Sequence, residues 1–217
     1  MPHGNISQNA SRRHWNQVWS SKSHSEVSWY QADPVPSLKA VDRIGVSASD
    51  VVIDVGCGES HLSEGLIHRG VGVLHLVDVS EVALDAVRTR LDSSEHAAEV
   101  HTHAIDVLEL DPIPSVSLWH DRAALHFIRD PEARSRYSEI AARAVRPGGH
   151  LIIGGFAPDG PSRCSDLVVV RADLRDLAIL FEGGFELSAS HRESHSTPWG
   201  AEQPFQWCTF VRRGRRS

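Results

Sequence analysis

The sequence has few cysteines and no long apolar run, and each shortage excludes a class of protein. Its 217 residues hold three cysteines, Cys57, Cys164 and Cys208, too few and too widely spaced for a disulfide framework or a Cys-x-x-Cys metal site. No apolar segment approaches the roughly 20 residues that a membrane-spanning helix requires. The polar N-terminal residues lack the apolar centre of a signal peptide. We therefore expect a cytoplasmic protein that does not associate with membranes.

Positive charge and metal-binding motifs are scarce as well. The formal net charge is −6, so a general nucleic-acid surface is not expected, although residues 212–216 are locally basic. The 14 histidines form no His-Glu-x-x-His pattern, and the nearest approach to one, residues 191–195, lies in a polar stretch after an expected strand. The sequence therefore predicts neither a bound metal nor a nucleic-acid partner, and it leaves the oligomeric state open.

What remains is the composition of an ordinary globular protein. With 41% hydrophobic and 23% charged residues, a chain of this length can bury a full core. Residues 1–12 are polar and are expected to form a disordered tail. We expect residues 13–217 to form a single domain, in which residues 13–45 are an N-terminal helical lid.

Aromatic residues, only 6% of the chain, are concentrated in this lid segment. Trp15 and Trp19 are four residues apart, and Trp29 follows closely. At this spacing the first two tryptophans could simply seat a short helix on the core. Alternatively, the three rings could cover a flat ligand such as adenine, because aromatic faces stack well and exclude water. Both interpretations stay open at this point.

The stretch at residues 51–60 is an apolar run that leads into a glycine turn. The run is short and rich in β-branched residues, which is typical of a buried parallel strand. Gly56 and Gly58 allow a sharp turn and a close approach to a ligand because neither has a Cβ atom. Cys57 between them is interpreted as a small packing residue within this loop rather than a nucleophile. Helical spacing resumes at Leu62, so the turn predicts a nucleotide-type cradle at a helix N-terminus.

Two nucleotide-binding motifs that this loop lacks narrow the choice of its ligand. A dinucleotide fingerprint would have a third glycine at position 61, where this chain has histidine. A P-loop would need a nearby lysine, and there is none. Asp54 stands just before the first glycine, where a carboxylate would repel a pyrophosphate but would suit the ammonium of an amino acid.

Two further expected strands also end in an acid. Asp78 follows residues 73–77, about twenty residues beyond the glycine turn, where α/β nucleotide sites place the carboxylate that binds ribose hydroxyls. Asp106 follows a third strand and is assigned to an adenine amino group; Val79 and Val107 come next to these two acids. Ligands of an open parallel sheet lie beyond the carboxyl ends of its strands, so the three acids are expected to converge on one crevice.

The rest of the pattern predicts an α/β fold. Short apolar strands are expected at residues 116–119 and 151–156, with helices before and between the strands. Residues 172–181 are expected to be helical. Residues 185–190 and 205–211 alternate in polarity and predict two antiparallel strands at one edge of the sheet.

The order of these motifs resembles that of the class I S-adenosylmethionine-dependent methyltransferases. The match lies in Val-Ile-Asp-Val-Gly-Cys-Gly at 52–58, Val-Asp-Val-Ser at 77–80, Asp-Val at 106–107 and Arg-Pro-Gly-Gly at 146–149. The resemblance implies a Rossmann-like, mostly parallel seven-stranded sheet with a C-terminal antiparallel hairpin and helices on both faces. It also implies S-adenosylmethionine as cofactor, bound by the lid tryptophans, the glycine turn, the three acids with their following valines, and His120.

A second resemblance concerns the methyl acceptor. Trp-His-Asp-Arg-Ala-Ala-Leu at 119–125 is similar to the Asp-Arg-Gly-Ala-Leu segment of the thiopurine methyltransferase group and its bacterial thiol relatives, with Ala123 in place of glycine. It implies a small-molecule acceptor with a soft nucleophile such as a thiol, whose thiolate Arg122 would favour. For a hydroxyl or ammonium acceptor, Asp121 or His126 would be the candidate base. Two alternatives are a protein lysine methyltransferase, whose family carries a similar Asp-Lys-Gly segment, and a non-catalytic cofactor-binding module.

Overall fold

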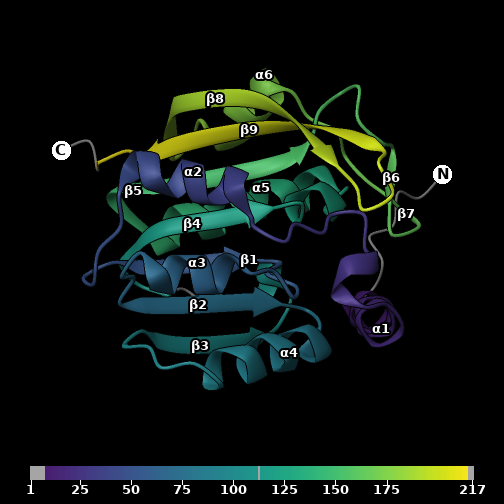
Figure 1. Ribbon diagram of the computed structural model, residues 1–217. Helices are drawn as coiled ribbons and strands as arrows, with labels where there is room; N and C mark the ends of the chain where they lie inside the picture. The colour runs from purple at the N-terminus through teal and green to yellow at the C-terminus, as the bar shows by residue number, and fades with distance from the viewer. Residues whose placement is uncertain (1–7, 112, 215–217) are drawn as a thin grey trace.

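The computed structural model describes residues 8–111 and 113–214, and its centre is a seven-stranded sheet (Figure 1). The strand order is β3-β2-β1-β4-β5-β9-β8, in which the first five strands are parallel and β9 runs antiparallel to both β5 and β8. This confirms the predicted mostly parallel sheet with a C-terminal antiparallel hairpin. The strands are β1 (Val51–Val55), β2 (Val73–Asp78), β3 (Glu99–Ala104), β4 (Val116–Arg122), β5 (Val145–Phe156), β8 (Phe185–Ser196) and β9 (Glu202–Arg212).

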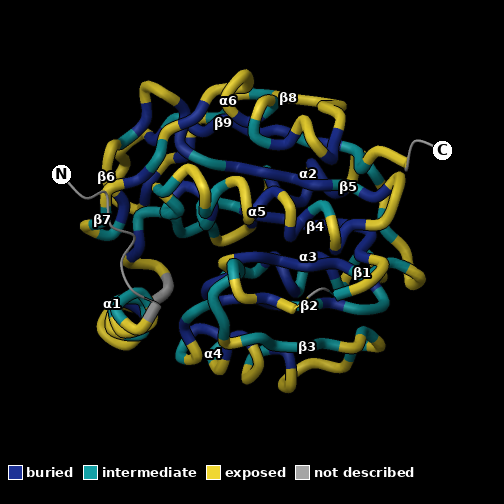
Figure 2. The backbone as a smooth tube through the Cα atoms, turned by 180° about the vertical axis from the view of Figure 1, so that it is seen from behind, coloured by how far each residue is buried: buried dark blue, intermediate teal, exposed yellow. Residues whose placement is uncertain are grey.

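Helices pack on both faces of this sheet (Figures 1 and 2). The helices and 3-10 turns are α1 (Gln8–Ser21), η1 (His24–Glu26), α2 (Val35–Ile44), α3 (Leu62–His68), α4 (Glu81–Asp92), η2 (Val107–Glu109), η3 (Leu125–Phe127), α5 (Pro131–Ala144) and α6 (Leu174–Phe181). Val52 lies in one buried cluster with Leu38 of α2 and Leu66 of α3. Its neighbour Ile53 lies in a second cluster with Tyr137 of α5, as the alternation of side chains along a strand requires. Across the described residues, every helix is too short or too polar to cross a membrane.

The register of the parallel strands places their carboxyl ends at one edge. Val55, the last residue of β1, is opposite Val77 of β2 and Asp121 of β4. Asp78, the last residue of β2, is opposite Ala104 at the end of β3. The turns that leave these strands therefore meet in one region, the position that open α/β sheets use for ligands.

The N-terminal region and β4 differ from the sequence prediction. Residues 8–12, expected to be disordered, form the start of helix α1, whereas residues 1–7 of the expected tail lie outside the described part. Arg12 Nη2 donates a hydrogen bond to the carbonyl oxygen of Ala104 at 3.1 Å, which ties the polar first turns of the helix to the end of β3. Strand β4 continues to Arg122 instead of ending at Trp119, because residues 120–122 pair with β5.

A small hairpin that the sequence did not predict follows β5. It consists of β6 (Arg163–Cys164) and β7 (Leu167–Val168). Ser165 and Asp166, which join the two strands, both have positive φ angles, 47° and 61°. Helix α1 and this hairpin lie at the same end of the molecule in both views (Figures 1 and 2). The hairpin thus belongs to the same end as the N-terminal lid.

Three histidines gather on β2 and β3, on the sheet face opposite α3 and α4. The Nδ1 atom of His75 lies 2.9 Å from Nε2 of His103, and the His75 ring stacks on that of His101. Burial, reinforced by the two neighbouring histidines, lowers the pKa of His75 to about 4. His75 is therefore neutral near pH 7.

Candidate functional site

A cavity of about 640 Å³ opens at the carboxyl ends of the parallel strands. Its walls come from α1, the segment before α2, the glycine turn, the ends of β2, β3 and β4, and the β6–β7 hairpin. Thirteen of the predicted site residues line it: Trp15, Trp19, Trp29, Asp54, Gly56, Cys57, Gly58, Asp78, Val79, Asp106, Val107, His120 and Arg122. Two others, Asp121 and His126, are not among the lining residues.

The glycine turn is shaped by close packing against the protein's own side chains. Gly56 and Gly58 have φ angles of 62° and 51°, a region that favours glycine. A Cβ on Gly56 would lie 2.5 Å from Cβ of Ala124, and one on Gly58 would lie 2.7 Å from the Trp19 ring. The sequence analysis explained these glycines by the close approach of a ligand. The structure shows that the side chains of Ala124 and Trp19 also leave no room for a Cβ atom at these two positions. The lid and the turn are therefore in direct contact.

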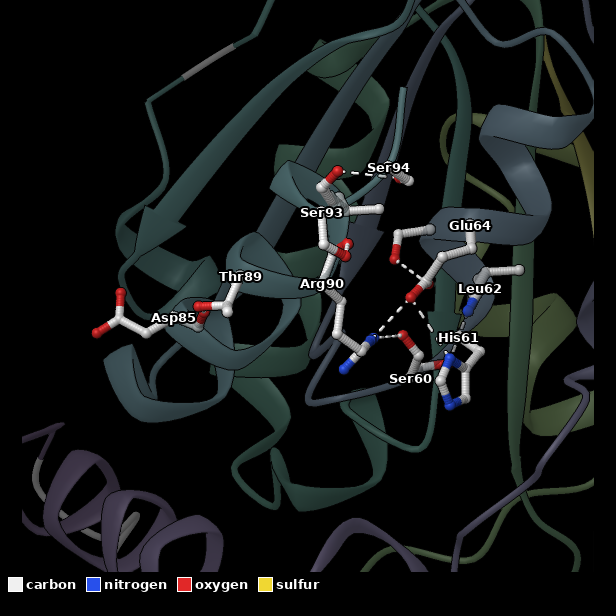
Figure 3. Close-up of polar contacts among 11 residues, drawn as sticks. Ser60, His61, Leu62, Glu64, Asp85, Thr89, Arg90, Ser93 and Ser94 are labelled. Atoms are coloured by element: carbon white, nitrogen blue, oxygen red, sulfur yellow. Dashed lines mark hydrogen bonds and ion pairs between the residues drawn. The ribbon is translucent and has the colours of Figure 1, made fainter. Parts of the chain in front are cut away.

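An arginine on α4 braces this turn from outside the cavity (Figure 3). The Arg90 Nε atom donates a hydrogen bond to Glu64 Oε1 of α3 at 2.8 Å, and Nη2 donates to the carbonyl oxygen of Ser60 at 2.9 Å. This ion pair holds the pKa of the Glu64 carboxyl below its usual range, against the effect of burial. The sequence analysis missed Arg90 because no motif links an α4 residue to the turn.

Asp78 ties the end of β2 to the glycine turn. Its Oδ2 accepts a hydrogen bond from the Gly58 N–H at 2.9 Å, and its Oδ1 accepts one from the Ser80 N–H at 2.8 Å. Burial, with a smaller contribution from the charge of Asp54, raises the pKa of Asp78 to about 6 although these hydrogen bonds oppose the shift. The protein thus holds a largely desolvated carboxylate in the cavity wall, where hydroxyl donors of a ligand would stabilise it.

Asp54 lies at the cavity floor in a chain of buried polar groups. Its Oδ1 is 2.7 Å from Nδ1 of His120, and Nε2 of His120 is 2.9 Å from the Ser37 hydroxyl of α2. All three side chains line the cavity and are almost fully buried. The sequence predicted a ligand ammonium as the partner of Asp54, and the structure gives this carboxylate a histidine partner as well.

Asp106 completes the predicted convergence of strand-end acids. It caps η2, because its Oδ1 accepts a hydrogen bond from the Leu108 N–H at 2.9 Å. With Asp54 and Asp78 it lines the same cavity, as expected from the parallel order of β1, β2 and β3. The wall near the glycine turn is therefore acidic.

The lid tryptophans form an edge-to-face cluster over the cavity. The ring centroids of Trp15 and Trp19 lie 5.9 Å and 5.8 Å from that of Trp29. Helix α1 is fixed to the end of the sheet, because the Ser80 hydroxyl donates to Asn16 Oδ1 at 2.8 Å. Trp15 and Trp29 are partly exposed in the cavity, whereas Trp19 is 7% exposed. The cluster therefore packs in the protein and lines the cavity, and that its rings cover a flat ligand stays a prediction.

Asp121 is buried and is not among the cavity-lining residues, so its position does not support its assignment as a candidate base. Its neighbour His120 lines the cavity, and because side chains alternate along β4, Asp121 points to the opposite face. Its carboxylate is fully buried, accepts hydrogen bonds from the N–H groups of Ala124 and Leu125, and accepts one from the Tyr137 hydroxyl at 2.6 Å. Burial raises the pKa of Asp121. The side chain anchors the turn after β4.

His126 is likewise separated from the cavity. It is 3% exposed and packs against the rings of Phe127 and Phe156. Burial and the nearby positive charges of Arg122 and Arg134 lower the pKa of His126 to about 3. The assignment of His126 as a base is therefore not supported by its position.

Arg122 is a partly buried cation at the cavity wall. Its Nη1 donates a hydrogen bond to the Trp29 carbonyl oxygen at 3.0 Å, and the guanidinium stacks over the Phe205 ring at 5.0 Å. Its Nε atom is buried and has no acceptor, and within the described residues no carboxylate oxygen lies within 4 Å of the guanidinium. Burial lowers the pKa of Arg122 to about 10, so the side chain remains charged at neutral pH.

Among the described residues, the cysteines and histidines form no further metal site, and the cysteine thiols are not activated. Cys57 and Cys208 are free and buried, and burial raises the pKa of both thiols, that of Cys208 to about 12. Cys164 of the hairpin lines the cavity, and burial raises its pKa to about 11. In the part of the chain that the structure describes, no three histidine, cysteine or acidic side chains are arranged to hold a metal ion.

Comparison with known proteins agrees with this geometry. The sequence profile of the family described as Methyltransferase domain matches residues 52–149. A ubiquinone biosynthesis O-methyltransferase of Alkalilimnicola ehrlichii is 35% identical over 46% of this chain and 39% of that protein. Methyltransferase GfsG of Streptomyces halstedii is 29% identical over 66% of this chain and 47% of that protein. The chain thus spans less than half the length of these two relatives.

Solved structures show the same fold at low sequence identity. A protein that converts a disulfide bond into a thioacetal group during echinomycin biosynthesis has a TM-score of 0.76 and 17% identity, covering 94% of each chain. The 1,6-didemethyltoxoflavin-N1-methyltransferase of Burkholderia thailandensis, solved with its substrate and S-adenosylhomocysteine, has a TM-score of 0.69 and 20% identity, covering 95% of this chain and 85% of that one. The profile match over residues 52–149, the sheet order and the three converging acids agree: the chain has the fold of these methyltransferases, and its central segment is similar to the methyltransferase-domain family.

Proposed function

We propose that this chain transfers a methyl group from S-adenosylmethionine to a small-molecule acceptor bound in the same cavity. The observation that carries the proposal is the single cavity in which the glycine turn, the three strand-end acids and Arg122 meet. When bound, S-adenosylmethionine supplies a methyl group on a sulfonium: the acceptor atom gains the methyl, and the electron pair of the broken bond neutralises the sulfonium. The residues present fit this cofactor, since the turn requires glycine and the adjacent wall offers carboxylates to its cationic and hydroxyl-bearing parts.

At the cofactor end, each acid has a separate partner in this proposal. Asp78 accepts hydrogen bonds from the ribose hydroxyls, and Asp106 accepts one from the adenine amino group. Asp54, with His120 and Ser37, holds the ammonium end near the glycine turn. The desolvated state of Asp78 supports its role, because a buried carboxylate gains most from new donors.

At the acceptor end, we propose a soft nucleophile, most directly a thiol. Neither Asp121 nor His126 lines the cavity, and both ring nitrogens of His120 already have partners. Because none of these three residues is available as a base, the cavity favours an acceptor that loses its proton without one. A thiol with a pKa of about 8.5 is partly ionised at neutral pH. The unpaired cation of Arg122 would stabilise the thiolate. Positioning and exclusion of water by the lid would then provide most of the rate enhancement.

A methyl-transfer assay tests this proposal. The purified chain is incubated with S-adenosylmethionine and, separately, with simple thiols, phenols and lysine peptides, and formation of the demethylated cofactor is measured. We expect turnover with a small thiol and none with lysine peptides. Turnover of a peptide but no thiol would replace the proposal with protein methylation, and cofactor binding without turnover of any acceptor would indicate a non-catalytic module.

A further inference from the structure

The acids and the arginines that line the cavity come from different elements of the fold; we call the first set the cofactor end and the second the basic end. The acids of the cofactor end come from the glycine turn and the ends of β1 to β3. The basic side chains that line the cavity are three arginines from other parts of the fold: Arg122 at the end of β4, Arg129 before α5 and Arg163 on β6. A cationic cofactor and an anionic second ligand would each meet complementary charge in such a cavity.

Arg122 has no carboxylate in contact with its guanidinium among the described residues, although the charges of Glu193 and Asp54 act on it from a greater distance. A guanidinium removed from water normally gains a carboxylate partner, because an unpaired buried charge is costly. Here the side chain donates only to a backbone carbonyl and lies over an aromatic ring, and its buried Nε has no acceptor among the described residues. An anionic ligand at this end of the cavity would therefore give Arg122 the direct ion pair that it lacks.

Arg129 and Arg163 extend this basic end toward solvent. Both are exposed, and neither forms an ion pair with a carboxylate in residues 8–111 and 113–214. The guanidinium of Arg163 donates a hydrogen bond to the backbone carbonyl oxygen of Asp166. Because a carbonyl oxygen carries no net charge, this bond does not neutralise the arginine. Asp166 also lines the cavity, and its carboxylate partly offsets the charge of the adjacent Arg163.

The walls between these charges are aromatic and apolar. Trp15, Trp29 and Phe127 line the cavity, and the Trp15 and Phe127 ring centroids are 4.9 Å apart in an edge-to-face arrangement. Ala123, Ala124 and Ile128 add small apolar surface beside them. Flat apolar bodies pack well against such rings.

We propose that the methyl acceptor is a flat organic acid, whose carboxylate is bound by Arg129 and Arg163 while its nucleophilic atom lies beside Arg122. The proposal rests on the function proposed above and specifies its substrate class. It makes the β6–β7 hairpin, which carries Arg163, a specificity element of the site.

Matched acceptors test the proposal directly. Thiophenol and the three mercaptobenzoate isomers share a ring and a thiol and differ in the carboxylate. We expect at least one isomer to have a kcat/KM about tenfold above that of thiophenol, mainly through a lower KM. The Arg129→Gln/Arg163→Gln double variant should remove most of this preference, whereas Arg143→Gln, which removes an exposed arginine of α5 remote from the cavity lining, should keep it.

A binding measurement tests the organic-acid proposal independently of the proposed methyl transfer. Benzoate is titrated into the chain saturated with S-adenosylhomocysteine, and binding is followed by calorimetry. We expect benzoate to bind, and to bind about tenfold more weakly to the double variant than to the Arg143→Gln control. If S-adenosylhomocysteine itself does not bind, the proposed function fails. If it binds, and benzoate does not bind or binds equally to all variants, the organic-acid proposal is overturned whether or not a thiol is methylated.

Discussion

Substitutions at Asp121 distinguish a structural acid from a catalytic base. In Asp121→Ala, the N–H groups of Ala124 and Leu125 and the hydroxyl of Tyr137 lose a buried acceptor. Each lost hydrogen bond to a buried group costs about 1–3 kcal/mol. Part of this cost is offset because a desolvated carboxylate is removed, so we expect a loss of unfolding free energy on the order of 3–5 kcal/mol.

Asp121→Asn keeps the shape and removes the basicity. The amide oxygen can still accept from the backbone N–H groups, and the amide nitrogen can donate to the Tyr137 oxygen, so we expect a loss of only about 1–2 kcal/mol. Urea unfolding at pH 7 measures both variants, and methyl transfer to the best thiol is measured beside it. We expect the Asn variant to retain most of the wild-type kcat. A folded Asn variant of near-native stability with a loss of about 100-fold or more in kcat, the scale of a missing general base, would refute the structural assignment.

Three further substitutions test the cofactor end and the sheet. Asp78→Ala should weaken binding of S-adenosylhomocysteine by about 1–3 kcal/mol in calorimetry, and an unchanged affinity would reject the ribose assignment. Gly58→Ala should lower the midpoint of thermal unfolding more than Gly70→Ala, because both positions have positive φ but only the first has a side chain, that of Trp19, where the new Cβ would lie. The pKa of His75 falls from 6.5 to about 4 in the folded chain, so its contribution to stability is complete above pH 6.5 and is lost as the pH decreases toward 4. Urea unfolding at pH 7 and pH 5 should therefore show a smaller acid destabilisation for His75→Gln than for the wild type, and equal losses would contradict this account.

Much of the sheet could be predicted from the sequence because its signals are local. The apolar run that ends at Val55 and the turn with Gly56 and Gly58 indicate a buried strand and a positive-φ turn without tertiary information. The convergence of the three acids follows from the parallel order of β1, β2 and β3, and the position of each acid at the end of an expected parallel strand was enough to predict it.

The errors arose where tertiary contacts decide the structure. The predicted fourth strand stopped at Trp119, so the alternation that separates His120 from Asp121 was not applied to the two residues. The β6–β7 hairpin turns at Ser165 and Asp166, and positive φ angles at two residues without glycine leave no clear signal in the sequence. The bond from Arg90 to the turn depends on how α3 and α4 pack together.

The proposed transfer of a methyl group requires first that the cavity binds the cofactor. Calorimetric titration of S-adenosylhomocysteine into the chain tests this most directly, with circular dichroism to verify that the protein is folded. We predict saturable binding at one site per chain, competed by S-adenosylmethionine and weakened by Asp78→Ala. A folded chain that binds neither molecule would contradict the account.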